Sequence, residues 1–254
     1  MSLADDQWSL LHFIAVAQDN TTEAVQHLGG ALEYLDKIDL VYREFIEGAG
    51  VVSPAAAAIL LLNTHACFRA AVLFSMSGQL LPVFMVLRGV LESALYANAM
   101  VIDKELQTIW LQRHMDEECR NRCKNSFTIK KLFKYLAQAQ NTEFTNAIKD
   151  QYEATIDFGA HPNNRSLLSK LRFEELEGGK HAVELAYLHG YLSTELRQCL
   201  VACAEIGIAG TFIALICAPK HSKLEELNTK VLALQAALPH FVAALGLSMG
   251  PPSE

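Results

Sequence analysis

The feature that most constrains this chain is a pair of long apolar segments separated by a short turn. The first segment is predicted as a helix over 53–78 that contains AAAAILLLNTHACFRAAVLFSM, and the second follows Gly78 and covers 82–102, beginning at Pro82. Both segments are apolar on nearly all faces, which is typical of helices at the centre of a protein. Sustained apolar–polar alternation, the mark of a half-buried strand, is missing from the sequence. We therefore predict an all-α fold, a helical bundle around a central antiparallel apolar hairpin.

Helical spacing of apolar residues continues through the rest of the chain. It predicts helices over 5–19, 21–47, 104–124, 128–139, 142–158, 181–217 and 222–246, with a loop at 159–166 and room for a short strand near 167–173. The chain contains no repeat and no low-complexity linker, and 51% of its residues are apolar. We predict one domain over 1–254, with residues 1–52 and 220–254 as candidates for peripheral helices.

The cellular location is predicted from the first residues and from one apolar segment. The opening MSLADDQWSL has acidic residues where a secretory leader has basic ones. Residues 199–218 are long enough to span a membrane, but Glu205 interrupts them, and a carboxylate at the centre of a bilayer is costly. We expect a cytoplasmic protein with reduced thiols and no membrane contact, whose remaining apolar surface forms a homodimer interface.

Arg88 and Glu92 stand four residues apart within the second apolar segment, so they share one helix face. A buried charge persists only when it is paired and hydrogen-bonded. One interpretation is an ion pair that fixes helix packing. The other is a polar pocket in which Glu92 orients Arg88 toward an anionic ligand.

His65 and Arg69 repeat this spacing in the first apolar segment. Helices joined near Gly78 would place residues at similar distances from the turn side by side. We therefore predict that Arg69 and Arg88 face one space with Glu92 as the shared acid. The alternative is that Arg69 extends to the surface.

The loop DFGAHPNNRS carries two further candidates, His161 as a catalytic residue and Asn163 as a binding residue. Loops commonly hold functional side chains, and histidine titrates near neutral pH. The alternative for His161 is a cap on a helix end.

A basic run, RNRCKNSFTIKKLFK at 120–134, contains six lysines and arginines, and no acid lies between Glu118 and Glu143. It is either an RNA or anion patch or a solvated helix face. The net charge of −7 gives the whole chain no general attraction to nucleic acid. Cys119/Cys123 and Cys199/Cys203 are each one turn apart, which is not a usual zinc spacing, so we expect no metal and no cofactor.

The segments SGQLLPVFMVLRGVLESALYANAM and DFGAHPNNRSLLS together resemble an uncharacterised bacterial all-helical family with a HEPN-like fold. That resemblance covers about 55–200 and implies shared positions at Arg88, Glu92 and His161. It also implies a setting in toxin–antitoxin or phage-defence systems. HEPN ribonucleases carry an arginine followed by a histidine after four to six residues, and no arginine here has that relation to a histidine. The resemblance thus implies the fold more than RNA cleavage.

Three functions remain open from the sequence. The first is a HEPN-like binding or regulatory protein with a pocket for an anionic or nucleotide-like ligand. The second is a metal-independent ribonuclease in which His161 is the general acid or base and an arginine stabilises the transition state. The third is an interaction module whose charges serve packing alone. Whether the protein is an enzyme is left undecided.

Overall fold

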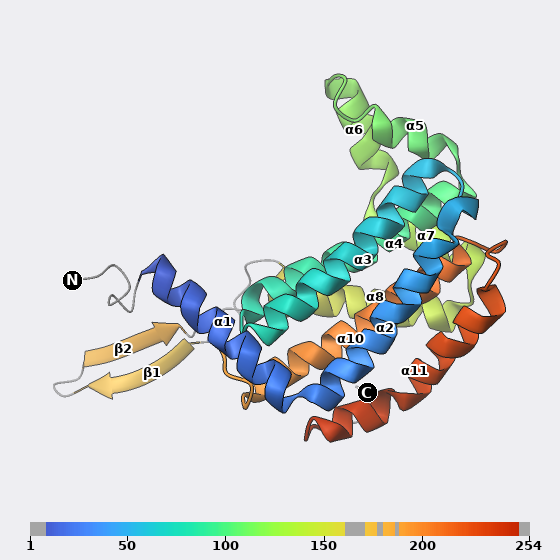
Figure 1. The fold of residues 1–254 in the computed structure, drawn as a ribbon. Helices are drawn as coiled ribbons and strands as arrows, with labels where there is room; N and C mark the ends of the chain where they lie inside the picture. Colours follow the sequence, from blue (N-terminus) through green and yellow to red (C-terminus); the bar gives the residue numbers. More distant parts are fainter. Residues whose placement is uncertain (1–8, 161–170, 177–179, 186–187, 249–254) are drawn as a thin grey trace.

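The computed structural model describes residues 9–160, 171–176, 180–185 and 188–248. In these parts the chain forms ten α-helices, two short irregular helices and one two-stranded hairpin (Figure 1). The elements in chain order are α1 (Leu10–His27), α2 (Gly29–Glu47), η1 (Ala49–Val51), α3 (Ala55–Met76), α4 (Leu80–Ile102), α5 (Glu105–Leu111), α6 (Glu117–Ser126), α7 (Ile129–Ala139), α8 (Thr142–Thr155), η2 (Ile156–Ala160), β1 (Leu171–Leu176), β2 (Lys180–Leu185), α10 (Thr194–Ile216) and α11 (Leu224–Ala244).

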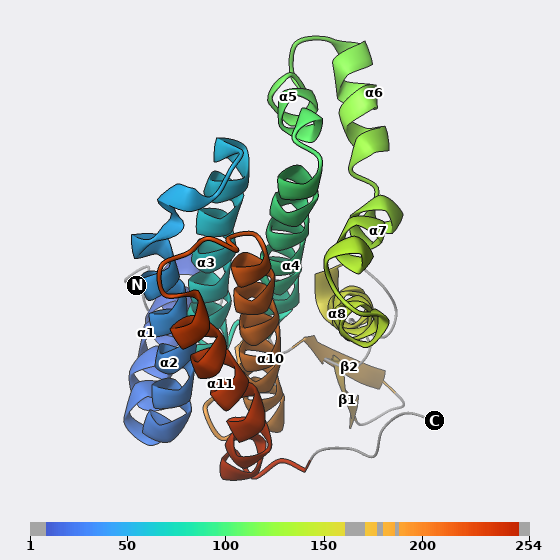
Figure 2. The same cartoon turned by 90° about the vertical axis from the view of Figure 1, so that its right-hand side faces the viewer.

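The predicted central hairpin is confirmed, because α3 and α4 form a tightly packed antiparallel pair. Gly78 makes the turn between them with a φ of +79°, a conformation that favours glycine. The backbone N–H of His189 donates to the Gly78 carbonyl at 3.0 Å, which ties the segment before α10 to this turn. Helix α10 packs along both members of the pair, with α2 and α11 on one side and α7 and α8 on the other (Figure 2).

Helix α10 is the most enclosed of the long helices, and glycines let its neighbours approach it. A Cβ on Gly207 would lie 2.6 Å from the ring of Phe68, and one on Gly210 would overlap the hydroxyl of Tyr42. Tyr42 lies in α2 and donates its hydroxyl hydrogen to the Gly207 carbonyl at 3.0 Å. Because Gly207 and Gly210 have no Cβ atom, α2 and α3 can pack closely against α10.

Two predicted boundaries are wrong. The first helix runs through residue 20 to His27, because the hydroxyls of Thr21 and Thr22 bond back to carbonyls one turn earlier instead of ending the helix. The predicted helix 181–217 begins only at Thr194, where the Ser193 hydroxyl accepts from the N–H of Leu196 at 3.1 Å. Residues 180–185 instead form β2, which pairs antiparallel with β1.

A third difference shapes the surface of the molecule. Residues 104–124 form two helices instead of one, with a turn at 112–116 between α5 and α6. We call α5, α6 and this turn (105–126) the arm. The arm projects from one end of the bundle beyond α4 and α7 (Figure 2).

Candidate functional site

The predicted pair Arg88 and Glu92 forms an ion pair and receives a third member from α8. Arg88 Nε donates to Glu92 Oε1 at 2.7 Å, and the Tyr152 hydroxyl donates to the same oxygen at 3.1 Å. The Arg88 guanidinium also lies over the Tyr152 ring, 5.1 Å from its centroid. Burial and the charge of Glu92 raise the pKa of Tyr152 to about 12, so Tyr152 remains a hydrogen-bond donor at neutral pH. Glu92 and Tyr152 therefore hold Arg88 in place between α4 and α8.

His65 and Arg69 lie on α3, and both bind Asp39 of α2. Arg69 donates twice to the Asp39 carboxylate, at 2.6 and 2.9 Å, and His65 Nε2 lies 2.6 Å from Oδ1 of the same group. Arg43 contributes a third basic contact at 2.9 Å. Burial alone would raise the pKa of Asp39, but the hydrogen bonds from Arg69 and His65 outweigh it and hold that pKa at about 2. For the base His65, burial disfavours the protonated form and therefore lowers the pKa.

These contacts give the two predicted pairs different acids. Asp39 serves Arg69 and Glu92 serves Arg88, so the expectation that Glu92 is shared between the arginines does not match the described contacts. The reason is that α3 turns His65 and Arg69 toward α2, whereas α4 turns Arg88 and Glu92 toward α8. Asp39 and Tyr152 were not among the predicted site residues. Both partners come from other helices, at separations of 26 and 60 residues.

The predicted loop residues His161 and Asn163 lie outside the described residues. The chain just before them, η2, packs on the first half of α4. The rings of Phe158 and Phe84 are 5.5 Å apart, and Gly159 has a φ of +151° beside the Leu81 carbonyl. The catalytic role of His161 and the binding role of Asn163 stay predictions.

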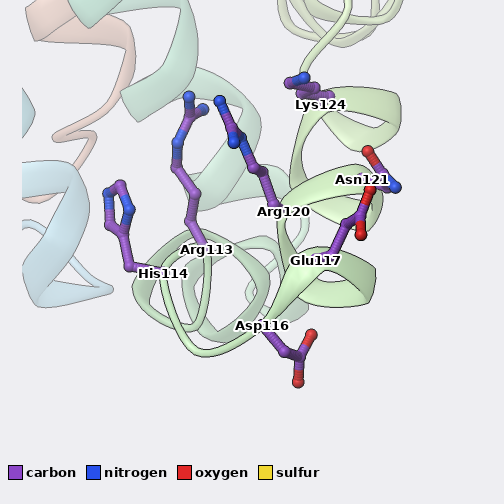
Figure 3. Close-up of a pocket in the computed structure, with 7 residues that line it drawn as sticks. All are labelled: Arg113, His114, Asp116, Glu117, Arg120, Asn121 and Lys124. Carbon is purple, nitrogen blue, oxygen red and sulfur yellow. The ribbon is translucent and has the colours of Figure 1, made fainter.

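A polar hollow of about 560 Å³ lies on the arm, between the end of α5 and α6 (Figure 3). We call it the tip hollow; its lining residues are Arg113, His114, Asp116, Glu117, Arg120, Asn121 and Lys124. The side chains of Arg113 and Arg120 extend in the same direction, while that of Asp116 points the opposite way (Figure 3). The lining thus combines three cationic side chains, a histidine and an amide with two acids.

The local fold of the arm explains why these charges are separated. Asp116 caps α6, since its carboxylate accepts from the N–H of Cys119 at 2.7 Å, and hydrogen bonds from this helix end lower its pKa. Glu117 and Glu118 follow in the first turn, where acids are favoured. The acids therefore collect at the beginning of α6 and the bases Arg120 and Lys124 further along it.

Arg120 and Lys124 belong to the predicted basic run, whereas Arg113 and His114 were not predicted as site residues. The signal was present: Asp116 followed by two glutamates is typical of a helix start. A second helix beginning there implies a turn, and a turn brings the end of the preceding helix beside the new one.

Three helices are long and apolar enough to cross a membrane, judged by length and composition alone. They are α3, α4 and α10, with mean hydropathies of 1.6, 1.5 and 2.2 and with 39%, 50% and 72% of their most apolar windows buried inside the protein. Only α10 was predicted from the sequence to have this length and composition, and the cytoplasmic location stays a prediction. In the described parts of the chain, no group of three or more His, Cys, Asp or Glu side chains is placed to hold a metal ion.

Comparison with known proteins gives no relative for this chain. No protein-family model, no curated protein and no solved structure matches it. The resemblance to HEPN-like proteins is therefore unsupported. The described residues show a helical fold with one short hairpin and no recognised family.

Proposed function

We propose that this protein binds a phosphate-bearing anion and that the tip hollow is its binding site. The observation that carries this proposal is the parallel arrangement of Arg113 and Arg120 along one hollow (Figure 3). Arg113, Arg120 and Lys124 take part in none of the ion pairs found among the described residues. Like charges that share a hollow repel each other, and an anion between them relieves the repulsion.

The chemistry of the lining suits an oxyanion such as phosphate. A guanidinium group donates two parallel hydrogen bonds to phosphate or carboxylate oxygens, and Lys124 adds a point charge. A hollow of about 560 Å³ is within the usual range for a small-molecule site.

The Arg88 cluster is the weaker candidate for the same function. Arg88 already carries Glu92 and the Tyr152 ring as partners, so its charge is engaged within the bundle. The ribonuclease alternative depends on His161, which lies outside the described residues. The proposal is therefore limited to binding.

The test is isothermal titration of inorganic pyrophosphate into the wild-type protein, Arg120→Gln and Arg122→Gln. Arg122 is the matched control because it is an exposed arginine on the same helix that does not line the hollow. A hydrogen bond to a charged group contributes about 1.5–3 kcal/mol, so Arg120→Gln should weaken binding about tenfold or more. Arg122→Gln should change it less than about twofold. Equal losses in the two variants, or no binding by the wild type at millimolar pyrophosphate, would contradict the proposal.

A further inference from the structure

A second hollow of about 290 Å³ lies at the base of the arm. We call it the base hollow; its lining residues are Asp103, Leu106, Ile109, Ser126, Lys131, Lys134, Tyr135 and Gln138. Helix α5 lines the base hollow with its middle, and residues just beyond its end line the tip hollow. Residues of α6 line the tip hollow up to Lys124, and its last residue, Ser126, reaches the base hollow. The tip hollow therefore lies on the arm, and the base hollow lies where the arm meets α7.

Positive charge follows the same path. Arg120 and Lys124 are one turn apart on α6, about 6 Å along its axis, and Lys131 and Lys134 are one turn apart on α7. Lys131 donates one hydrogen to the carbonyl of Asn125 at 2.8 Å, which positions its ammonium group and leaves two further donors. This concentration of charge contrasts with the net −7 of the whole chain. A row of cations on an acidic protein matches a ligand with repeated negative charges.

We propose that the two hollows together bind one single-stranded nucleic acid, with consecutive phosphates on the arginines of the tip hollow and the lysines of the base hollow. This inference rests on the proposed function, because it identifies the phosphate-bearing anion of the tip hollow as part of a longer strand. Binding of single strands combines a basic groove along the backbone with aromatic rings on which bases stack.

Tyr135 supplies the aromatic surface in the base hollow. Its ring is half-buried, and its hydroxyl donates to Asp103 Oδ2 at 3.0 Å, which fixes the orientation of the ring. The same bond engages the Asp103 carboxylate, the one acid among the residues that line this hollow. A duplex keeps its base faces covered, so an accessible ring favours a strand with unstacked bases.

The experiment measures two ligands on one set of full-length variants. Fluorescence anisotropy with a labelled 12-nucleotide oligothymidylate follows the strand, and calorimetry with inorganic pyrophosphate follows the tip hollow alone. Lys131→Gln/Lys134→Gln removes two charges from the base hollow. Lys104→Gln/Lys130→Gln is the matched control, because these lysines are exposed on the same helices or beside them but line neither hollow.

The Lys131→Gln/Lys134→Gln variant should bind the oligonucleotide about tenfold more weakly and leave pyrophosphate binding unchanged. Its salt dependence should also fall, by about 1.4 in the slope of log K against log salt, since each neutralised phosphate of a single strand contributes about 0.7. The control should follow the wild type. Tyr135→Leu should lose about fivefold or more, and Tyr135→Phe should lose less, because phenylalanine keeps the stacking ring and removes only the hydrogen bond to Asp103.

The outcomes separate this inference from the function on which it rests. Arg120-dependent pyrophosphate binding without a specific effect of Lys131 and Lys134 on the oligonucleotide would overturn the strand and leave the proposed function in place. Equal affinity for a 12-base-pair duplex, with no effect of Tyr135→Leu, would also overturn it. Capture of phosphatidylserine vesicles through Lys131 and Lys134 in place of the oligonucleotide would identify a membrane partner and reject the strand. If the wild-type protein itself does not bind pyrophosphate, the proposed function is rejected.

Discussion

The helix bundle and the arm differ in whether their charged side chains have partners of opposite charge within the protein. In the helix bundle, the Asp39 carboxylate accepts from Arg43, His65 and Arg69, and Glu92 accepts from Arg88 and Tyr152. On the arm, Arg113 and Arg120 share a hollow, while Asp116 is engaged by the end of α6. Charges neutralised within the protein stabilise packing, whereas charges without an internal acid remain available to a ligand. The spacing of charges along one helix does not distinguish these two cases. They differ in whether a neighbouring helix supplies a partner of opposite charge.

The largest effect that would sharpen this comparison is expected at Gly210 in the core. A Cβ there would overlap the Tyr42 hydroxyl and lie 3.0 Å from Val90, so Gly210→Ala should lower the free energy of unfolding by about 3 kcal/mol. The measurement is urea denaturation followed by circular dichroism. Gly30→Ala is the control, because that glycine has nothing within 4 Å of a Cβ, and it should be neutral or slightly stabilising. Similar losses in both variants would mean that contact with α2 does not set the packing of α10.

A smaller effect is expected at Asp39. Asp39→Asn should cost at most about 2 kcal/mol at pH 7, reduced by solvent screening because the side chains of Arg43 and Arg69 are 46% and 55% exposed. Asp36→Asn is the control, since that carboxylate is 72% exposed and lies 3.6 Å from Arg43. It should change stability by less than about 0.5 kcal/mol.

The pH dependence of the Asp39 effect has a definite sign. The pKa of Asp39 is about 2 in the folded protein and 3.8 in an unperturbed carboxyl. The folded state therefore favours the charged form, and the stabilisation is full above about pH 4 and lost as the pH falls toward 2. Urea midpoints of the wild type and Asp39→Asn at pH 7, 5, 4 and 3 should converge at the acid end. A constant difference down to pH 3 would show that packing and not charge causes the loss.

The smallest effect on stability is expected on the arm. Arg120→Gln and Arg122→Gln should each change the free energy of unfolding by less than about 0.5 kcal/mol, because neither arginine has a described acid partner to lose. Thermal denaturation of both variants without ligand measures this directly. A clear loss at Arg120 alone would assign that side chain to the stability of the arm and remove the contrast with the core.

Much of the fold could be predicted from the sequence because it follows from local patterns. The α3–α4 pair, α7 and α11 lie within a few residues of the predicted spans, since their apolar spacing and the turn at Gly78 are local features. The prediction was wrong at 181–185, where a strand replaces the start of the predicted helix. Helical spacing of apolar residues at 181–185 did not distinguish a helix from a strand, because the pairing with β1 lies outside that segment.

The site was harder to predict than the fold. The sequence by itself determined that Arg88 and Glu92 pair, because an α-helix places residues four apart on one face. It also determined that 119–142 carries six bases and no acid. Only the tertiary structure decided that Asp39 serves Arg69, that Tyr152 joins Glu92, and that the turn at 112–116 brings Arg113 into a hollow with Arg120. The physical reason is that helical periodicity fixes neighbours within one helix, whereas partners on different helices depend on how the helices pack and where the chain turns.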